Sequence, residues 1–224
     1  MTVELEPSPA STVVLMRAGD GARGLEVLLV RRNSSLAFYG GAWVFPGGRI
    51  DAGDGPPGDA EQVARAAAAR ELREETDLRV EAAELVHFAQ WLTPPGRARR
   101  FDTWYFAAFA PGGAVRVDQA EVDAHRWLTP AAALAARDEG QIELPPPTFV
   151  TLQQLSRLPH PAAALASLRA APVSRFVPRP CAADGGTIYL YQGDAGYAAS
   201  DPGIAGARHR LIAVGPTWHY ECSE

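Results

Sequence analysis

The sequence predicts an α/β fold with a mixed sheet, followed by an α+β extension at the C-terminal side. Two observations lead to this prediction. Through residues 1–144, β-branched and aromatic runs alternate with helical segments, an order typical of helices packed on a sheet. After Gly140 the chain changes to a proline-rich stretch followed by short apolar segments. We therefore expect a main domain over residues 1–144 and an extension over 145–224 that packs on the same domain.

The first elements are expected to form a β-hairpin. Residues 11–17 and 26–32 are apolar, β-branched runs, and the segment between them is rich in Gly and Asp, which favour turns. The run "AWVF" then leads into "PGG" at residues 46–48, and a loop rich in Asp, Gly and Pro follows to about residue 59. The alanine-rich segment 60–76 predicts the long helix of the domain.

Two strands are predicted over residues 84–94 and 99–111, because both segments are rich in aromatic and β-forming residues. A short strand ending near Trp127 precedes a helix for which Thr129 is the N-cap and Pro130 the first residue. In the extension we expect helices beginning near residues 148 and 160. We also expect the segments 187–197 and 208–215 to pair as strands.

Composition and charge exclude some classes of function. The net charge of −5 argues against a general binder of nucleic acid or of membrane surfaces, since both favour basic surfaces. No segment approaches the roughly 20 apolar residues of a membrane span, and the N-terminus lacks the pattern of a secretory signal. A cytoplasmic protein is expected. Cys181 and Cys222 lack metal-type spacing, and whether they are paired stays open.

Three carboxylates lie close together on the long helix. Glu71, Glu74 and Glu75 share one face, and like charges at this spacing destabilise a helix by roughly 0.2–0.5 kcal/mol per pair. Two explanations stay open. Arg70 and Arg73 can form exposed ion pairs, which makes this a solvated helix face. Alternatively, a divalent cation compensates the repulsion, because Mg²⁺ prefers oxygen ligands and bridges carboxylates to substrate phosphates.

The flanking residues carry a resemblance that bears on this choice. The segment "RELREETDL" and the preceding "WVFPGGRID" resemble the Nudix box, which reads Gly, five residues, Glu, seven residues, then Arg-Glu-U-x-Glu-Glu-x-Gly-U with U aliphatic. The second half of the box matches at Arg70, Glu71, Leu72, Glu74, Glu75 and Leu78. The resemblance implies a Nudix-type α/β/α sandwich and a nucleotide as small-molecule substrate.

This sequence departs from the box at two places. Asp77 stands where the box has its terminal Gly, and Asp tolerates the left-handed geometry that ends a helix. Gly48 lies twenty-two positions before Arg70 instead of fourteen, so an insertion near "DAGDGPPG" must lengthen the loop. Counting back from Arg70 places Gln62 at the Glu position of the box, with Glu61 beside it.

The long loop after "FPGG" is similar to the branch of Nudix hydrolases that contains coenzyme A diphosphatases. The segments "LLVRRNSS", "FDTWYFAAFAP", "DQAEVDAHRWLTPAAAL" and "LPPPTFVTLQQL" agree with that branch in order and spacing. The coenzyme A signature before "FPGG" is met in part, because Ala37 stands where a second arginine is expected.

The resemblance implies roles for the residues of the box. Glu71, Glu74 and Glu75 are the expected ligands of Mg²⁺ or Mn²⁺, and Arg70 is expected to orient them through a salt bridge. The turn at Gly47 and Gly48 lets the backbone pass close to the metal site.

Outside the box, Glu121 is the candidate for a further metal ligand or general base, with Asp123 behind it; a solvated loop acid is the alternative. Candidate arginines for substrate binding are Arg32, Arg97, Arg99 and Arg100. For Arg97, Arg99 and Arg100, solvent-exposed loop arginines without a ligand are the alternative. Trp91, Trp104 and Tyr105 either stack on a nucleobase or belong to the core. The five histidines receive no role.

Three hypotheses on function follow. The first is a metal-dependent hydrolase that cleaves the diphosphate of a nucleoside diphosphate linked to a moiety X. X is coenzyme A or acyl-coenzyme A, with ADP-ribose, another nucleotide sugar or a dinucleotide as alternatives. The second is a Nudix module that senses a nucleotide without cleaving it, and the third is a scaffold with an acidic helix. The extension covers the active site, forms a homodimer contact or completes the sheet.

Overall fold

The central sheet of the molecule is mixed, as the sequence predicts. The computed structural model describes residues 6–19, 24–36, 38–56 and 58–223. In the described residues the sheet has the order β3-β2-β1-β6-β5-β8, while β4 pairs with β1 and β7 pairs with β2. Its strands are β1 (Ser8–Ala18), β2 (Leu25–Arg32), β3 (Trp43–Val44), β4 (Gly47–Arg49), β5 (Val86–Leu92), β6 (Phe101–Phe109), β7 (Val122–Leu128) and β8 (Ser174–Phe176).

Strand pairing combines local hairpins with long-range parallel contacts. The predicted hairpin is confirmed, because β1 and β2 are antiparallel with Met16 opposite Val27; its turn lies partly outside the described residues. β1 also runs parallel to β6 from Ser8↔Phe101 to Met16↔Phe109. This pairing places β1 at the centre of the sheet, buried on both faces.

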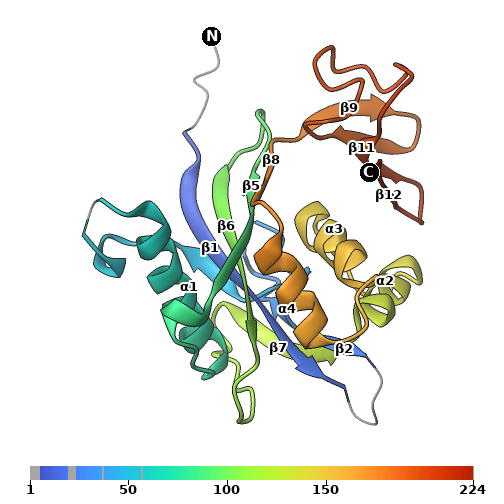
Figure 1. The fold of residues 1–224 in the computed structure, drawn as a ribbon. Helices are drawn as coiled ribbons and strands as arrows, with labels where there is room; N and C mark the ends of the chain where they lie inside the picture. Colours follow the sequence, from blue (N-terminus) through green and yellow to red (C-terminus); the bar gives the residue numbers. More distant parts are fainter. Residues whose placement is uncertain (1–5, 20–23, 37, 57, 224) are drawn as a thin grey trace.

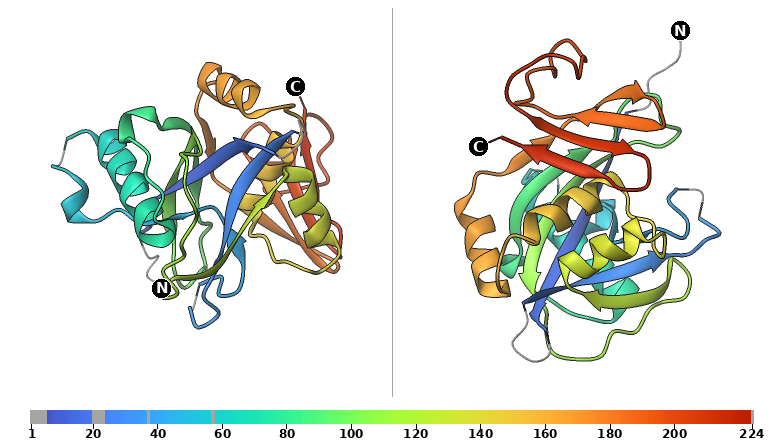
Figure 2. Two further views of the ribbon diagram at one scale, coloured as in Figure 1. Left: turned by 90° about the horizontal axis from the view of Figure 1, so that it is seen from below. Right: turned by 90° about the vertical axis from the view of Figure 1, so that its right-hand side faces the viewer.

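Helices cover both faces of the sheet (Figures 1 and 2). α1 (Ala60–Thr76) lies on one face and coincides with the predicted helix. The other face carries α2 (Pro130–Asp138), α3 (Pro146–Leu155) and α4 (Pro161–Ala170). Thr129 caps α2 by accepting a hydrogen bond from the N–H of Ala132, as its position before Pro130 predicts. The three layers are those of an α/β/α sandwich.

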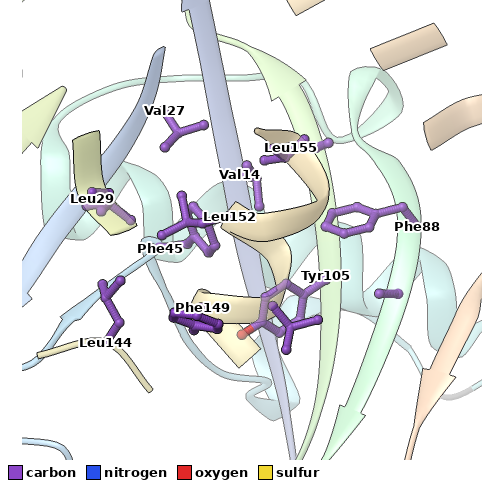
Figure 3. Packing of buried hydrophobic residues seen from close by; sticks show 14 of the residues in the cluster. Val14, Val27, Leu29, Phe45, Phe88, Tyr105, Leu144, Phe149, Leu152 and Leu155 are labelled. Carbon is purple, nitrogen blue, oxygen red and sulfur yellow. The ribbon is translucent and has the colours of Figure 1, made fainter. Parts of the chain in front are cut away.

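Alternation along β1 separates the two hydrophobic clusters. Val13 and Leu15 pack with residues of α1, whereas Val14 and Met16 pack with the helices on the opposite face. Figure 3 shows the second cluster, in which Val14 and Tyr105 from the strands face Leu152 of α3. Because both faces of β1 are covered, its sequence is a continuous apolar run.

The extension shares the core of the main domain. β8 joins the main sheet beside β5. Four further strands, β9 (Arg179–Ala183), β10 (Gly186–Leu190), β11 (His209–Val214) and β12 (His219–Cys222), form a separate antiparallel sheet beyond α3 (Figures 1 and 2). The predicted pairing of the last apolar segments is confirmed by β10 and β11, with Ile188 opposite Ile212. Leu211 of β11 is buried in the same cluster as α3.

The structure also answers the question that the sequence leaves open about the two cysteines. Cys181 in β9 and Cys222 in β12 are free thiols in the described chain, on opposite edge strands of the second sheet. Among the described residues, no helix is long and apolar enough to cross a membrane.

Candidate active site

Helix α1 has defined ends, which fix the positions of its glutamates. Asp59 caps its start by accepting a hydrogen bond from the N–H of Gln62 at 3.1 Å. At its end, Asp77 adopts a left-handed conformation with φ 61°, and its N–H donates to the carbonyl of Arg73 at 2.9 Å. The expectation that Asp77 ends the helix without a glycine is therefore confirmed.

The three glutamates of α1 differ in environment. Glu75 is 2% exposed and Glu71 is 8% exposed, whereas the side chain of Glu74 is 49% exposed. The N–H of Gly47 donates to Oε2 of Glu75 at 2.9 Å. Two carboxylates of the predicted set thus lie against Gly47 and Gly48, and the third faces solvent. These two glycines begin strand β4 and do not form the turn that the sequence predicted, because both pair with β1.

Both glycines of β4 are required by close approach. A Cβ on Gly48 would lie 2.4 Å from Cδ of Glu71. A Cβ on Gly47 would lie 2.3 Å from the carbonyl oxygen of Ser11 in β1, and Gly47 has φ 155°. Gly47 and Gly48 pair with Thr12 and Ser11 of β1. Side chains here would displace either the carboxylate or the strand.

Arg70 links the helix to the loop that precedes it. Its guanidinium makes two hydrogen bonds to Asp54, at 2.7 and 2.9 Å. Nη1 of Arg70 also donates to Glu71 at 2.9 Å and to Glu74 at 3.0 Å. Arg70 therefore holds the carboxylates of Glu71 and Glu74 together, while Asp54 fixes Arg70 in a bidentate pair.

Asp54 corrects the placement of the insertion. It lies six positions after Gly48, which is the Gly-to-Glu spacing of the box, so the extra residues lie between Asp54 and Arg70. Counting back from Arg70, which points to Gln62 and Glu61, is wrong: Glu61 instead bonds Arg65 at 3.1 Å. Counting forward from Gly48 would have found Asp54 from the sequence.

Burial raises the pKa of the two inward glutamates. It raises the pKa of Glu75 to about 8, against the opposing effect of the Gly47 N–H. It also raises the pKa of Glu71, which the ion pair with Arg70 opposes. The charge of Glu121 contributes to both shifts, and Arg32 lowers the pKa of Glu75. Glu121 and Arg32 therefore lie near the buried carboxylates.

Glu121 is placed by a turn before β7. It is exposed, and its N–H donates to the carboxylate of Asp118 at 3.1 Å. Its carbonyl accepts a hydrogen bond from the N–H of Asn33 at 2.8 Å, which holds this turn against the end of β2. Asp123 is engaged elsewhere, in an ion pair with Arg31 at 2.6 Å.

The four candidate arginines are in different surroundings. Nε of Arg32 donates to the carbonyl of Phe38 at 3.2 Å. Arg97 and Arg99 are exposed in the loop between β5 and β6. Arg100 is 9% exposed and donates to the carbonyl of Thr93 at 3.1 Å, so it holds this loop in place. Ala37, which the coenzyme A signature would replace by arginine, lies outside the described residues.

The aromatic candidates divide between core and sheet surface. Trp91 stacks on Phe176 of β8 with ring centroids 3.9 Å apart, and Tyr105 is 7% exposed. Trp104 is partly buried and contacts His87, with ring centroids 4.6 Å apart. Trp91 and Tyr105 therefore belong to the core, which is the structural alternative that the sequence leaves open for them.

The donor set suits a hard cation. Glu71, Glu74 and Glu75 supply only oxygen atoms, which Mg²⁺ and Mn²⁺ accept. Among the described residues, no three His, Cys, Asp or Glu side chains are positioned so that together they could hold a metal ion. Glu71 and Glu75 are nevertheless buried, and nearby carboxylate charges raise the pKa of both. A bound cation would relieve this repulsion and the cost of burying the two charges.

Comparison with known proteins agrees with this geometry. The family model described as the NUDIX domain matches residues 7–146, which is more than half of the chain. A curated relative, "Acyl-coenzyme A diphosphatase NUDT19" of Xenopus laevis, is 29% identical over 143 residues, covering 59% of this chain and 37% of the relative. The chain spans 37% and 56% of the lengths of the curated relatives it matches.

Solved structures share the fold. A NUDIX hydrolase from Alicyclobacillus acidocaldarius aligns with a TM-score of 0.64 at 24% identity, over 75% of this chain and 99% of that chain. The NUDIX domain of Shewanella oneidensis NrtR, complexed with ADP ribose, aligns with a TM-score of 0.51 at 22% identity, over 67% and 86%. Because the family model matches residues 7–146 and the box residues are arranged as described above, the chain belongs to the Nudix hydrolase family.

Proposed function

We propose that the chain is a metal-dependent hydrolase that cleaves the diphosphate bond of a nucleoside diphosphate linked to another moiety, X. The observation that carries this proposal is the pair of buried carboxylates, Glu71 and Glu75, which lie against Gly47 and Gly48 of β4. The alternative, a solvated acidic helix face, accounts for the ion pair of Arg70 with Glu74. It does not account for two buried carboxylates.

The proposed metal site consists of Glu71, Glu74 and Glu75. Bound Mg²⁺ or Mn²⁺ would neutralise charge on the phosphates and lower the pKa of a coordinated water. For this site to form, Glu75 must lose its proton, since burial raises its pKa to about 8. Arg70 acts as a positioning residue, because its guanidinium bridges Glu71 and Glu74 and is itself held by Asp54.

Glu121 is the proposed general base. It is exposed, it lies near both buried glutamates, and its backbone is fixed at both ends by Asp118 and Asn33. A carboxylate so placed accepts the proton of an attacking water. Arg32, Arg97 and Arg99 are proposed to bind the phosphates of the substrate, and Arg100 to hold their loop.

For X, coenzyme A or an acyl-coenzyme A is the first proposal. It rests on the relative from Xenopus laevis, named an acyl-coenzyme A diphosphatase. ADP-ribose is the alternative, since the NUDIX domain from Shewanella oneidensis has ADP ribose in its complex.

We place the protein in the cytoplasm, acting as a monomer or a homodimer.

A substrate panel tests the proposal. Coenzyme A, acetyl-coenzyme A, ADP-ribose, NADH and diadenosine polyphosphates are incubated with the protein and Mg²⁺ or Mn²⁺, and products are separated by chromatography. Cleavage of one member at its diphosphate supports the hydrolase and names X. Binding of a panel member without any cleavage would instead support a nucleotide-sensing module.

A further inference from the structure

The short turn that carries Glu121 is organised by the side chain of Asp118. Oδ1 of Asp118 accepts hydrogen bonds from three successive backbone N–H groups, at 3.2, 3.2 and 3.0 Å, those of Ala120, Glu121 and Val122. The N–H of Glu121 also lies 3.1 Å from Oδ2 of Asp118. Because one carboxylate accepts from three neighbouring residues, the backbone on both sides of Glu121 is restrained.

The turn also contains a residue in a conformation that is uncommon outside glycine. Gln119 has φ 64°. Its N–H donates to the carbonyl of Val122 at 3.0 Å, and its carbonyl accepts a hydrogen bond from Nδ2 of Asn33 at 3.4 Å. A left-handed glutamine persists only where its surroundings hold it, so the turn has a defined shape.

Strand β7 has a β-bulge directly after Glu121. Arg31 of β2 lies opposite Ala124, whereas Arg32 lies opposite Val122, so the register passes over Asp123. The carboxylate of Asp123 forms its ion pair with Arg31 at 2.6 Å. A bulge changes the direction in which nearby side chains point, and bulges are frequent beside active sites. The start of β7 therefore acts together with the turn to set the direction of the Glu121 side chain.

The turn is anchored at the end of the sheet that holds the buried glutamates. The N–H of Asn33, which follows β2, donates to the carbonyl of Glu121 at 2.8 Å. The N–H of the preceding residue, the last of β2, donates to the carbonyl of Ala42 at 3.0 Å. Five residues after Ala42 comes Gly47, whose N–H donates to Glu75. A short path of backbone therefore connects the turn to the carboxylates of α1.

We propose that Asp118 is a positioning residue for the hydrolysis, because it holds Glu121 where its carboxylate takes a proton from the attacking water. This inference rests on the proposed function, in which Glu121 is the general base. In that step the water oxygen bonds to phosphorus, its proton passes to Glu121, and the bond between phosphorus and the bridging oxygen breaks. A base displaced from its reacting position transfers the proton less well. Asp118 acts only through the backbone of Glu121.

A double-mutant cycle separates the positioning of Glu121 from a general structural role. kcat and KM are measured with Mg²⁺, on the substrate identified by the panel, for wild type, Asp118→Ala, Glu121→Gln and the double variant. Asp118→Asn keeps an oxygen that can accept the same backbone hydrogen bonds. Asp201→Ala is the matched control, since Asp201 is an exposed aspartate of the extension whose Oδ1 accepts from the N–H of Gly203 at 2.8 Å. Urea unfolding checks that each variant is folded.

We expect Asp118→Ala to lower kcat by at least about tenfold with KM within about twofold of wild type, since a displaced base slows the chemical step and leaves binding intact. Asp118→Asn should keep kcat within about threefold of wild type, and Asp201→Ala should equal wild type. Glu121→Gln should lose at least about a hundredfold. In that background Asp118→Ala should change kcat by less than about twofold, because no base is left to position.

An equal loss of kcat from Asp118→Ala with and without the Glu121 carboxylate would overturn the inference. So would an Asp118→Ala variant as fast as wild type, or an Asp118→Asn variant as slow as Asp118→Ala. If Asp118→Ala does not fold, Asp118→Ser takes its place in the same cycle, because a serine hydroxyl makes the same kind of bond more weakly.

The inference and the proposed function fail in different ways. A wild type that cleaves no member of the panel overturns the proposed function, and the inference with it. Turnover that Glu121→Gln leaves unchanged overturns the role of Glu121 and the inference, but leaves the metal-dependent hydrolase. Turnover that depends on Glu121 and not on Asp118 overturns the inference alone.

Discussion

Adding one methyl group should impair turnover at Gly48 and stability at Gly47, the two glycines of β4. In Gly48→Ala the new Cβ would lie 2.4 Å from Cδ of Glu71. An ordinary contact needs about 3.4 Å, so the carboxylate must move by about 1 Å. The atoms it meets are the end of a flexible side chain, so the fold can adjust. A displacement of about 1 Å in a reacting group lowers turnover by roughly a hundredfold.

In Gly47→Ala the obstacle is the backbone of β1. The new Cβ would lie 2.3 Å from the carbonyl of Ser11 and 2.6 Å from Cα of Thr12. The φ of 155° adds strain of about 1–3 kcal/mol for a residue with a side chain. We expect Gly47→Ala to destabilise the fold by more than about 2 kcal/mol, since the strand must also shift.

The assay is urea unfolding for both variants, combined with kcat on the substrate identified by the panel. Gly48→Ala should keep the unfolding midpoint of wild type and lose turnover, whereas Gly47→Ala should lose stability first. Gly53→Ala is a suitable control, because a Cβ there meets no heavy atom within 4 Å. A Gly48→Ala variant with kcat within about threefold of wild type would refute the placement of Glu71 in the site.

Three more predictions concern charged groups. Asp54→Asn should destabilise the protein by about 1–3 kcal/mol in urea unfolding and lower kcat, since it removes the bidentate partner of the partly buried Arg70. The pKa of Glu75 near 8 means that metal binding below this pH releases a proton, so metal affinity measured by calorimetry should rise with pH, up to about tenfold per unit, and level off above about pH 8. A pH-independent affinity would contradict this. Burial raises the pKa of Asp194, but hydrogen bonds from Arg210 and backbone N–H groups lower it to a net value of about 2. Asp194→Asn should therefore cost about 3–5 kcal/mol at neutral pH, and this stabilisation should fade in wild type as pH falls from about 4 toward 2, as followed by circular dichroism.

The raised pKa of Glu75 also determines how the stability of the metal-free protein depends on pH. A group whose pKa is higher in the folded state stabilises the fold while it is protonated, and this stability is lost as pH rises through about 8. Metal-free wild type should therefore unfold at lower urea above pH 8 than at pH 6, and added Mg²⁺ should reduce that difference.

Local sequence signals predicted most of the main domain. Residues 60–76 form the predicted helix, and the hairpin of β1 and β2 forms between segments close in the chain. The parallel pairing of β1 with β6 was not predicted, because strands about ninety residues apart leave no local signal for their register. β9 and β12 were also missed, because both are short and carry few buried residues.

Parts of the candidate site escaped prediction because they depend on contacts distant in sequence. Asp54 was missed by counting from the wrong end of a loop that contains an insertion. The burial of Arg100 and the ion pair of Asp123 with Arg31 depend on how loops pack, which charge alone does not indicate.

The most direct test of the central claim is the rate of diphosphate cleavage by wild type, Glu71→Gln and Glu75→Gln, each with Mg²⁺ and with a chelator. Glutamine keeps the size of the side chain and removes the charge that would hold the cation. We expect wild type to cleave only with metal, and both variants to lose turnover by at least about a thousandfold while remaining folded. Cleavage that survives in the variants, or in the presence of the chelator, would contradict a hydrolase that depends on these carboxylates.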